Sequence, residues 1–172
     1  LSLKRHGGVV GIPVGKIKTM KQLRATIERI AAHDAWVLIT GEPGSGKEVA
    51  ARYLHGKSAR RDRPFVELNL AALPAQDMAT KLFGAERDGE ITAGVFEQAA
   101  GGSLFLDQIG DLDLATQTRL LAGLENGQYL RAGGKSPIAL DARILAATSL
   151  DPARAIAEGR LRPGVYRLRL RI

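Results

Sequence analysis

The chain has 172 residues, of which 45% are hydrophobic and 25% charged, a composition typical of one globular domain with its own core. It contains no cysteine, which excludes disulfide bonds and thiolate metal sites and agrees with a cytoplasmic protein. No apolar run is long enough to span a membrane and no signal peptide opens the sequence, so we expect no membrane partner.

The net charge of +7 is compatible with a nucleic-acid partner, but also with a basic solvated surface that has no such role. The three histidines, His6, His33 and His55, are scattered without catalytic or metal-ligand spacing. We therefore expect them to be structural or surface residues.

Helical and extended patterns alternate along the chain. Residues 1–13 are glycine-rich and basic, and we interpret them as an N-terminal arm or linker that precedes a domain over residues 14–172. Apolar positions recur at helical spacing over 18–32. The patterns that follow predict strands over 36–40, 65–69, 103–107 and 143–147, and helices over 47–54, 75–83, 113–124 and 152–158.

This alternation predicts an α/β fold with a parallel sheet covered by helices on both faces. The strands are continuous apolar runs, which agrees with burial on both sides. Residues 166–172 differ because leucine and arginine alternate strictly there. We expect this last strand to lie at an edge, or to have lost a covering domain.

A glycine-rich turn joins the first predicted strand to the next helix. Residues 41–47, G-E-P-G-S-G-K, fit the P-loop spacing G-x-x-x-x-G-K. Glycines let successive backbone N–H groups point at phosphate oxygens, and the helix N-terminus adds partial positive charge. Lys47 would reach the outer phosphates. The usual Ser or Thr after the lysine, a magnesium ligand, is Glu48 here.

A second motif follows about sixty residues later. Residues 104–107 form an apolar run that ends in Asp107, as in a Walker B strand whose carboxylate lies near magnesium. Ligands of such sheets bind at the carboxyl ends of the strands, so Asp107 and Lys47 should converge on one crevice.

The residue after this aspartate is Gln108, where ATP-hydrolysing relatives usually have glutamate. An amide cannot accept a proton at neutral pH, although it can orient water. Loss of a general base costs about 10²–10⁴ in rate. Gln108 is either the natural residue or an engineered substitution, and the sequence does not separate these alternatives.

Several segments resemble one family, the AAA+ domain of sigma-54-dependent bacterial transcription regulators. Residues 41–48 are similar to its G-E-x-G-x-G-K-E, residues 101–112 to G-G-T-L-F-L-D-E-I-G-D-L, and residues 143–149 to R-I-I-A-A-T-N. Residues 15–20 resemble the opening G-K-S-x-x-M that flanks adenine, and residues 65–69 the strand whose asparagine contacts the catalytic glutamate. The resemblance accounts for Glu48 and covers nearly the whole chain.

The resemblance implies a P-loop NTPase AAA+ core with a parallel five-stranded sheet, a helical lid that lies beyond this chain, and ATP with Mg²⁺ as cofactors. Lys47 would contact phosphates, Asp107 would hold the metal, and Thr148 would sense the terminal phosphate. The implied nucleotide-binding residues are Gly15, Gly41, Glu42, Pro43, Gly44, Ser45, Gly46, Lys47, Glu48, Val49, Asp107 and Thr148.

Four further residues receive catalytic positions from the resemblance. Gln108 occupies the glutamate position, and Asn69 is the switch residue that normally restrains that glutamate. Arg162 and Arg167 would be arginine fingers that enter the site of a neighbouring subunit, although the family spaces its two arginines one residue farther apart. The alternative for Arg162 is a surface charge. Glu97 and Arg131 also match family positions and receive no role.

One family feature is missing. The sigma-contacting loop G-A-F-T-G-A should follow residues 82–86, L-F-G-A-E, but a shorter segment without an aromatic, R-D-G-E-I-T-A, stands there. Response regulators of the NtrX type lack the same loop. The chain resembles the central domain of such a regulator, which implies a receiver domain and a DNA-binding helix-turn-helix beside it in the parent protein.

These observations favour an ATP-binding regulatory domain in which the nucleotide gates self-assembly, as a ring or dimer, with weak or no hydrolysis. The alternative is an active ATPase motor that remodels a sigma-54 RNA polymerase complex. Direct nucleic-acid binding through the arginine-rich residues 160–171 is a third hypothesis, but no interleaved aromatic residues support it. A small-molecule kinase is a fourth, and no substrate-side residues favour it.

Overall fold

A parallel sheet forms the centre of the molecule. The computed structural model describes residues 2–3, 10–11 and 19–172. Five parallel strands lie in the order β11 (Leu168–Arg171), β3 (Val37–Thr40), β10 (Arg143–Thr148), β7 (Ser103–Asp107) and β4 (Phe65–Asn69). The predicted five-stranded parallel sheet is therefore confirmed. Two short strands extend it beside β11, namely β2 (Val10–Gly11) and β1 (Ser2–Leu3).

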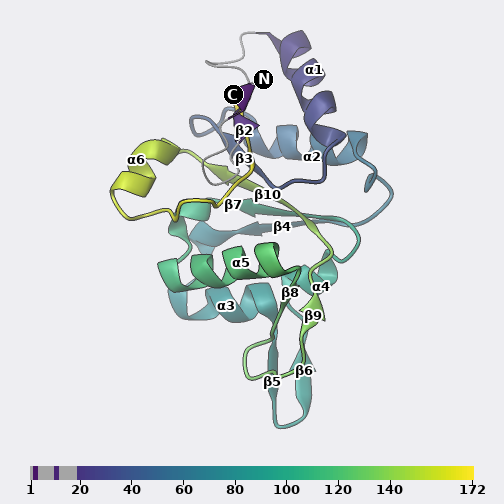
Figure 1. The fold of residues 1–172 in the computed structure, drawn as a ribbon, viewed down its shortest axis with the longest axis vertical. Coiled ribbons are helices and arrows are strands. Elements are labelled where there is room, and N and C mark those ends of the chain that lie inside the picture. The colour runs from purple at the N-terminus through teal and green to yellow at the C-terminus, as the bar shows by residue number, and fades with distance from the viewer. Residues whose placement is uncertain (1, 4–9, 12–18) are drawn as a thin grey trace.

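Helices cover both faces of the sheet, as predicted (Figure 1). One face carries α1 (Met20–Ala31) and α2 (Lys47–Lys57), and the other carries α3 (Ala75–Phe83), α4 (Val95–Gln98), α5 (Leu114–Asn126) and α6 (Pro152–Ala157). Successive strand residues point to opposite faces. In β3, Val37 and Ile39 pack in the core beneath α1 and α2, whereas Leu38 packs in the other core.

The last strand keeps its alternation within the sheet. Leu168 and Leu170 are buried in the core beneath α1 and α2, while Arg169 donates from Nε to Thr40 Oγ1 at 3.3 Å. Of the five main strands β11 lies at one edge and β4 at the other, and within the described residues the two-residue β2 pairs with the free side of β11. The strand covers 168–171 rather than the predicted 166–172.

Several helix boundaries follow from capping side chains. Thr19, Asp113 and Asp151 accept backbone N–H bonds at the starts of α1, α5 and α6. The second helix runs to Lys57 rather than ending at Leu54. Its added turn contains His55, a buried side chain whose Nδ1 lies 2.8 Å from Ser103 Oγ, so the structural reading of this histidine is confirmed.

Two small hairpins were not predicted. One joins β5 (Ala85–Arg87) to β6 (Glu90–Thr92) and projects away from the main sheet, and the other joins β8 (Gln128–Tyr129) to β9 (Ile138–Ala139) (Figure 1). Arg131 links them by donating to both carboxylate oxygens of Glu97, at 2.8 and 2.9 Å, and to Glu86 at 2.7 Å. These bonds lower the pKa of Glu97 below its usual value.

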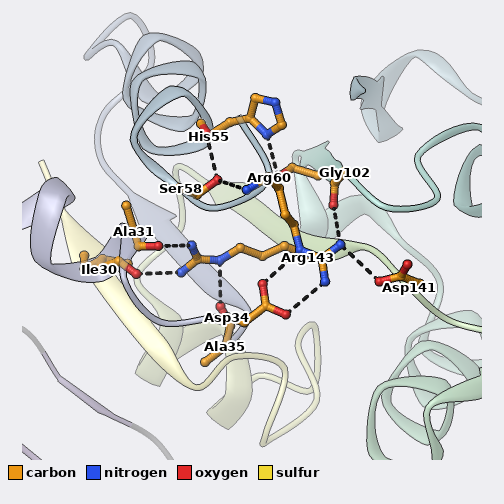
Figure 2. A network of polar contacts seen from close by, with 11 residues as sticks. Ile30, Ala31, Asp34, Ala35, His55, Ser58, Arg60, Gly102, Asp141 and Arg143 are labelled. Atoms are coloured by element: carbon orange, nitrogen blue, oxygen red, sulfur yellow. Dashed lines mark hydrogen bonds and ion pairs between the residues drawn. The ribbon is translucent and has the colours of Figure 1, made fainter. Parts of the chain in front are cut away.

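A buried arginine lies at the amino end of the central strand β10 (Figure 2). The side chain of Arg143, at the start of β10, is 1% exposed and donates to the carbonyl oxygens of Ile30, Ala31 and Ala35. It therefore supplies hydrogen bonds to carbonyl groups at the end of α1 and in the segment that leads to β3. Close by, Arg60 forms a two-pronged ion pair with Asp34.

No helix among residues 19–172 is both long enough and apolar enough to cross a bilayer.

Candidate nucleotide-binding site

The carboxyl ends of four strands meet at one edge of the sheet. In the strand register Asn69 lies beside Asp107, and Thr148 lies beside Thr40, the last residue before the glycine-rich turn. Parallel strands end at the same edge, which explains why residues far apart in sequence converge there. The structure therefore brings the predicted P-loop, Walker B and sensor positions together.

The glycine-rich turn has the backbone of a phosphate loop. Gly44 and Gly46 have φ of 76° and 91°, in the left-handed region that side chains with a Cβ disfavour. Gly46 is the N-cap of α2, so the exposed turn opens directly onto a helix N-terminus. Its unpaired N–H groups and the helix dipole favour an anion at this position.

Lys47 is the first residue of α2, and its side chain folds back over this turn. Its side chain is 8% exposed, and Nζ donates to the carbonyl oxygens of Gly41 and Glu42, at 2.9 Å each, and to Ser149 Oγ at 3.2 Å. A buried ammonium requires such partners. The contacts hold the positive charge inside the loop, where the outer phosphates of a nucleotide would lie.

Asp107 and Gln108 form the end of the Walker B strand. Asp107 Oδ1 accepts from the Gln108 backbone N–H at 2.9 Å. Gln108 has φ 59° and ψ 54°, a left-handed conformation that costs a non-glycine residue about 1 kcal/mol or more. This conformation turns the chain sharply into the short helix η3 (Ile109–Asp111).

Asn69 and Thr148 are each engaged by a neighbouring backbone group. Asn69 Oδ1 accepts from Ala71 N–H at 3.0 Å, which caps the short helix η2 (Leu70–Ala72). The buried Thr148 hydroxyl accepts from Leu150 N–H at 3.1 Å. Among residues 19–172, the structure has no hydrogen bond between Asn69 and Gln108.

Glu48 and Val49 lie exposed on the first turn of α2. The Glu48 carboxylate pairs with Arg52 at 3.2 Å, and Arg52 also pairs with Glu67 on β4. Hydrogen bonding with Glu67 and Arg52 lowers the pKa of Glu48, whereas burial raises the pKa of Glu67. Glu48 therefore pairs with Arg52, and this environment differs from that of the Ser or Thr that usually binds magnesium in a P-loop.

The two candidate arginine fingers occupy different environments. The Arg162 side chain is exposed on the segment after α6. The Arg167 guanidinium instead lies 4.6 Å from the ring centre of Trp36, at the amino end of β3 and so at the edge opposite the phosphate loop. Of the other predicted residues, Gly15 and His6 lie outside the part of the chain that the structure describes.

The donor set at Asp107 suits magnesium held jointly with a nucleotide. Residues 19–172 contain no group of three or more His, Cys, Asp or Glu side chains that could cage a metal. Mg²⁺ usually takes one or two carboxylates together with phosphate oxygens and water. A single carboxylate beside a phosphate loop fits this pattern.

The sigma-54 interaction domain model matches residues 14–172. The chain belongs to this family. NtrC from Rhizobium meliloti is 43% identical over 162 residues, which cover 91% of this chain and 34% of that protein. NtrC from Azospirillum brasilense is 44% identical over 158 residues, 89% of this chain and 33% of that protein. The chain thus spans about a third of the length of these relatives.

Solved structures agree with this assignment. NtrX from Brucella abortus in complex with ATP has a TM-score of 0.83 and 36% identity, over 94% of this chain and 36% of that one. The P-loop NTPase domain of an E. coli sigma-54 activator has a TM-score of 0.59 at 20% identity and covers 83% of this chain and 97% of that one. This second likeness shows the fold alone.

Some residues around the site of this sigma-54 interaction domain were missed. Ser149 contacts Lys47, and its position directly after Thr148 at a strand end was the available signal. Gln117 is fully buried and hydrogen-bonded to the Arg162 backbone N–H at 2.9 Å. Its signal was a polar residue at a core position, midway between Leu114 and Leu120.

Proposed function

We propose that this domain binds ATP with Mg²⁺ and that the bound nucleotide gates self-assembly, with little or no hydrolysis, in a cytoplasmic bacterial transcription regulator. DNA would be contacted by a flanking domain of the parent protein. The observation that carries the proposal is Gln108, an amide held by a left-handed backbone at the position of the catalytic base.

The binding half of the proposal is supported by the phosphate loop. Gly44, Gly46 and the start of α2 offer backbone N–H groups, and Lys47 offers a buried ammonium within the same loop. Asp107 would hold Mg²⁺, which when bound would neutralise phosphate charge. The solved complex of the related NtrX with ATP adds support for the same ligand here.

The limited hydrolysis follows from what a side-chain amide can do. An amide oxygen accepts a hydrogen bond from water but does not take its proton at neutral pH. Asp107 would hold Mg²⁺ and the Glu48 carboxylate pairs with Arg52, so we expect neither to act as a substitute base. ATP would then act as a ligand whose residence time is set by dissociation.

The proposed gating of self-assembly depends on an exposed arginine. The Arg162 side chain is exposed, as a residue that completes the site of a neighbouring subunit would be. Such an arginine would contact nucleotide only after assembly, so ATP and the second subunit would favour each other's binding.

An active motor that remodels a sigma-54 RNA polymerase complex is the second candidate, and membership of the sigma-54 interaction domain family favours it. The short hairpin β5–β6 argues against the motor function. Residues 87–93, R-D-G-E-I-T-A, cover the turn and second strand of this hairpin; they replace the family's sigma-contacting loop and contain no aromatic side chain.

Assembly measured by sedimentation, with and without Mg-ATP, tests the proposal. We expect ATP to shift the protein from monomer to oligomer, and Lys47→Ala to abolish both ATP binding and the shift. Lys57→Ala removes an exposed lysine from the same helix and should behave like the unchanged protein. A monomer under every nucleotide condition would contradict the proposed gating.

A further inference from the structure

A buried glutamine lies in α5 at a position where the helical pattern expects an apolar residue. Gln117 is 0% exposed and stands three residues after Leu114 and three before Leu120. A primary amide in an apolar core is unfavourable unless its hydrogen bonds are satisfied. The arrangement around Gln117 satisfies both its oxygen and its nitrogen.

Its three bonds join segments outside its own helix. Nε2 donates to the carbonyl oxygens of Leu112, at 2.8 Å, and Arg160, at 3.1 Å. Oε1 accepts from the backbone N–H of Arg162 at 2.9 Å. Only an amide supplies both an acceptor and two donors at this length, since a glutamate lacks donors and a methionine lacks all three groups.

On one side, the hydrogen bonds of Gln117 hold the segment that carries Arg162, one of the two candidate arginine fingers. The Arg160 and Leu161 N–H groups donate to the Ala155 carbonyl oxygen, at 2.9 and 3.2 Å, and the Leu161 side chain is 2% exposed. The backbone of 160–162 is thus held between α6 and Gln117. Because Leu161 points inward, the side chains of Arg160 and Arg162 are exposed.

On the other side, Gln117 is hydrogen-bonded to the segment that follows the Walker B strand. Leu112 is the C-cap of η3, which begins directly after Gln108. Ile109 and Leu112 are 0% and 2% exposed, so this short helix is packed into the core of the domain. Movement at Gln108 would therefore reach Gln117 through a short, tightly packed segment.

We infer that Gln117 is a positioning residue, which fixes the direction of Arg162 toward a neighbouring subunit and ties that direction to the Walker B segment of its own subunit. The nucleotide state of one site would thereby alter the arginine offered to the next site. Because Arg162 meets nucleotide only in an assembly, this role rests on the function proposed above.

A thermodynamic cycle on ATP-dependent assembly separates this role from simple support of the core. Four forms are compared, namely the unchanged protein, Gln117→Met, Arg162→Ala and the double variant. Sedimentation with Mg-ATP gives the protein concentration at half-assembly for each, and a fluorescent ATP analogue gives nucleotide affinity for dilute, unassembled subunits. Thr118→Ala, an exposed residue of the same helix, is the matched control.

We expect Gln117→Met to raise the concentration for half-assembly about tenfold or more, from the loss of three bonds that fix the arginine segment. Nucleotide affinity of the dilute subunits should change less than about twofold. The double variant should assemble no worse than Arg162→Ala alone, because both substitutions act through the same arginine. Thr118→Ala should match the unchanged protein.

Additive effects in the double variant, or unchanged assembly of Gln117→Met, would overturn the role of Gln117 and leave the proposed function intact. If the unchanged protein does not assemble with ATP, both the role of Gln117 and the proposed function are contradicted. Thermal unfolding of each form identifies loss of fold. If Gln117→Met unfolds, Gln117→Leu replaces it in the cycle, because it removes all three hydrogen bonds without burying a charge.

Discussion

Gln108 combines an unusual backbone with an unusual side chain. Its left-handed conformation belongs to the turn from β7 into η3, where the Asp107 carboxylate accepts its N–H at 2.9 Å. The conformation therefore comes from the local fold and does not depend on the amide. Replacing the amide with a carboxylate should leave this turn intact, which makes Gln108→Glu a clean chemical test.

Arg143 is the residue whose removal should most directly weaken the fold. Burial lowers its pKa to about 10, so it stays charged at neutral pH and relies on the three carbonyl groups at the end of α1. Arg143→Met would remove the guanidinium from all three carbonyls, of which Ile30 O keeps only its bond from His33 N–H, and we expect a loss of about 2–4 kcal/mol in the free energy of unfolding.

Urea denaturation of Arg143→Met beside Arg154→Met measures this effect. Arg154 is an exposed arginine paired with Glu158 on α6, so its replacement should change stability by less than about 0.5 kcal/mol. Equal losses in the two variants would contradict the role assigned to Arg143.

At the scale of elements, the Glu97–Arg131–Glu86 cluster fixes the β5–β6 hairpin against the domain. Hydrogen bonding to Arg131 lowers the pKa of Glu97, so folding favours its charged form. The resulting stability is fully present above the unfolded pKa, about 4.3, and is lost as the pH falls through the lower folded value.

Glu97→Gln should therefore cost about 1–2 kcal/mol at neutral pH and make stability less sensitive to acid below about pH 4.5. The urea midpoint measured from neutral to acidic pH checks both effects. Glu90→Gln, on the exposed strand β6, is the control. If Glu97→Gln loses stability in acid as steeply as the unchanged protein, the cluster does not contribute as described.

Two glycine-to-alanine substitutions should have opposite effects on stability, because one glycine is closely packed and the other is a helix residue with open space beside it. A Cβ at Gly102 would meet the Pro64 carbonyl oxygen, so Gly102→Ala should destabilise the domain by about 2 kcal/mol. Gly56 lies in α2 with nothing near its Cβ position, so Gly56→Ala should stabilise the domain by about 0.5 kcal/mol. Thermal unfolding that changes in the same direction for both would contradict this distinction.

The elements predicted from sequence are those with a strong local pattern. Apolar runs such as 36–40 and the spacing of leucines in 113–124 specify strands and helices by themselves. The β5–β6 and β8–β9 hairpins escaped prediction because their strands have only two or three residues and are held by Arg131, which is distant in sequence. Lys47 was predicted from its motif, whereas the roles of Ser149 and Gln117 depend on contacts with residues distant in sequence, which their local signals did not identify.

At the scale of the whole molecule, the carboxyl and amino edges of the sheet differ in the side chains that they carry. The carboxyl edge is open and carries the phosphate loop, Asp107 and Thr148, while the amino edge is closed by buried polar side chains such as Arg143 and His55. We expect substitutions at the amino edge to change stability and those at the carboxyl edge to change nucleotide responses.

The central claim is that ATP serves this domain as a ligand rather than as fuel. Magnesium-dependent ATP turnover by the unchanged protein, Gln108→Glu and Lys47→Ala, each at high concentration, tests it most directly. We predict turnover by Gln108→Glu about 10²–10⁴ above that of the unchanged protein, which should stay at the level of the Lys47→Ala blank. Turnover by the unchanged protein clearly above that blank would contradict the claim and make the domain a motor.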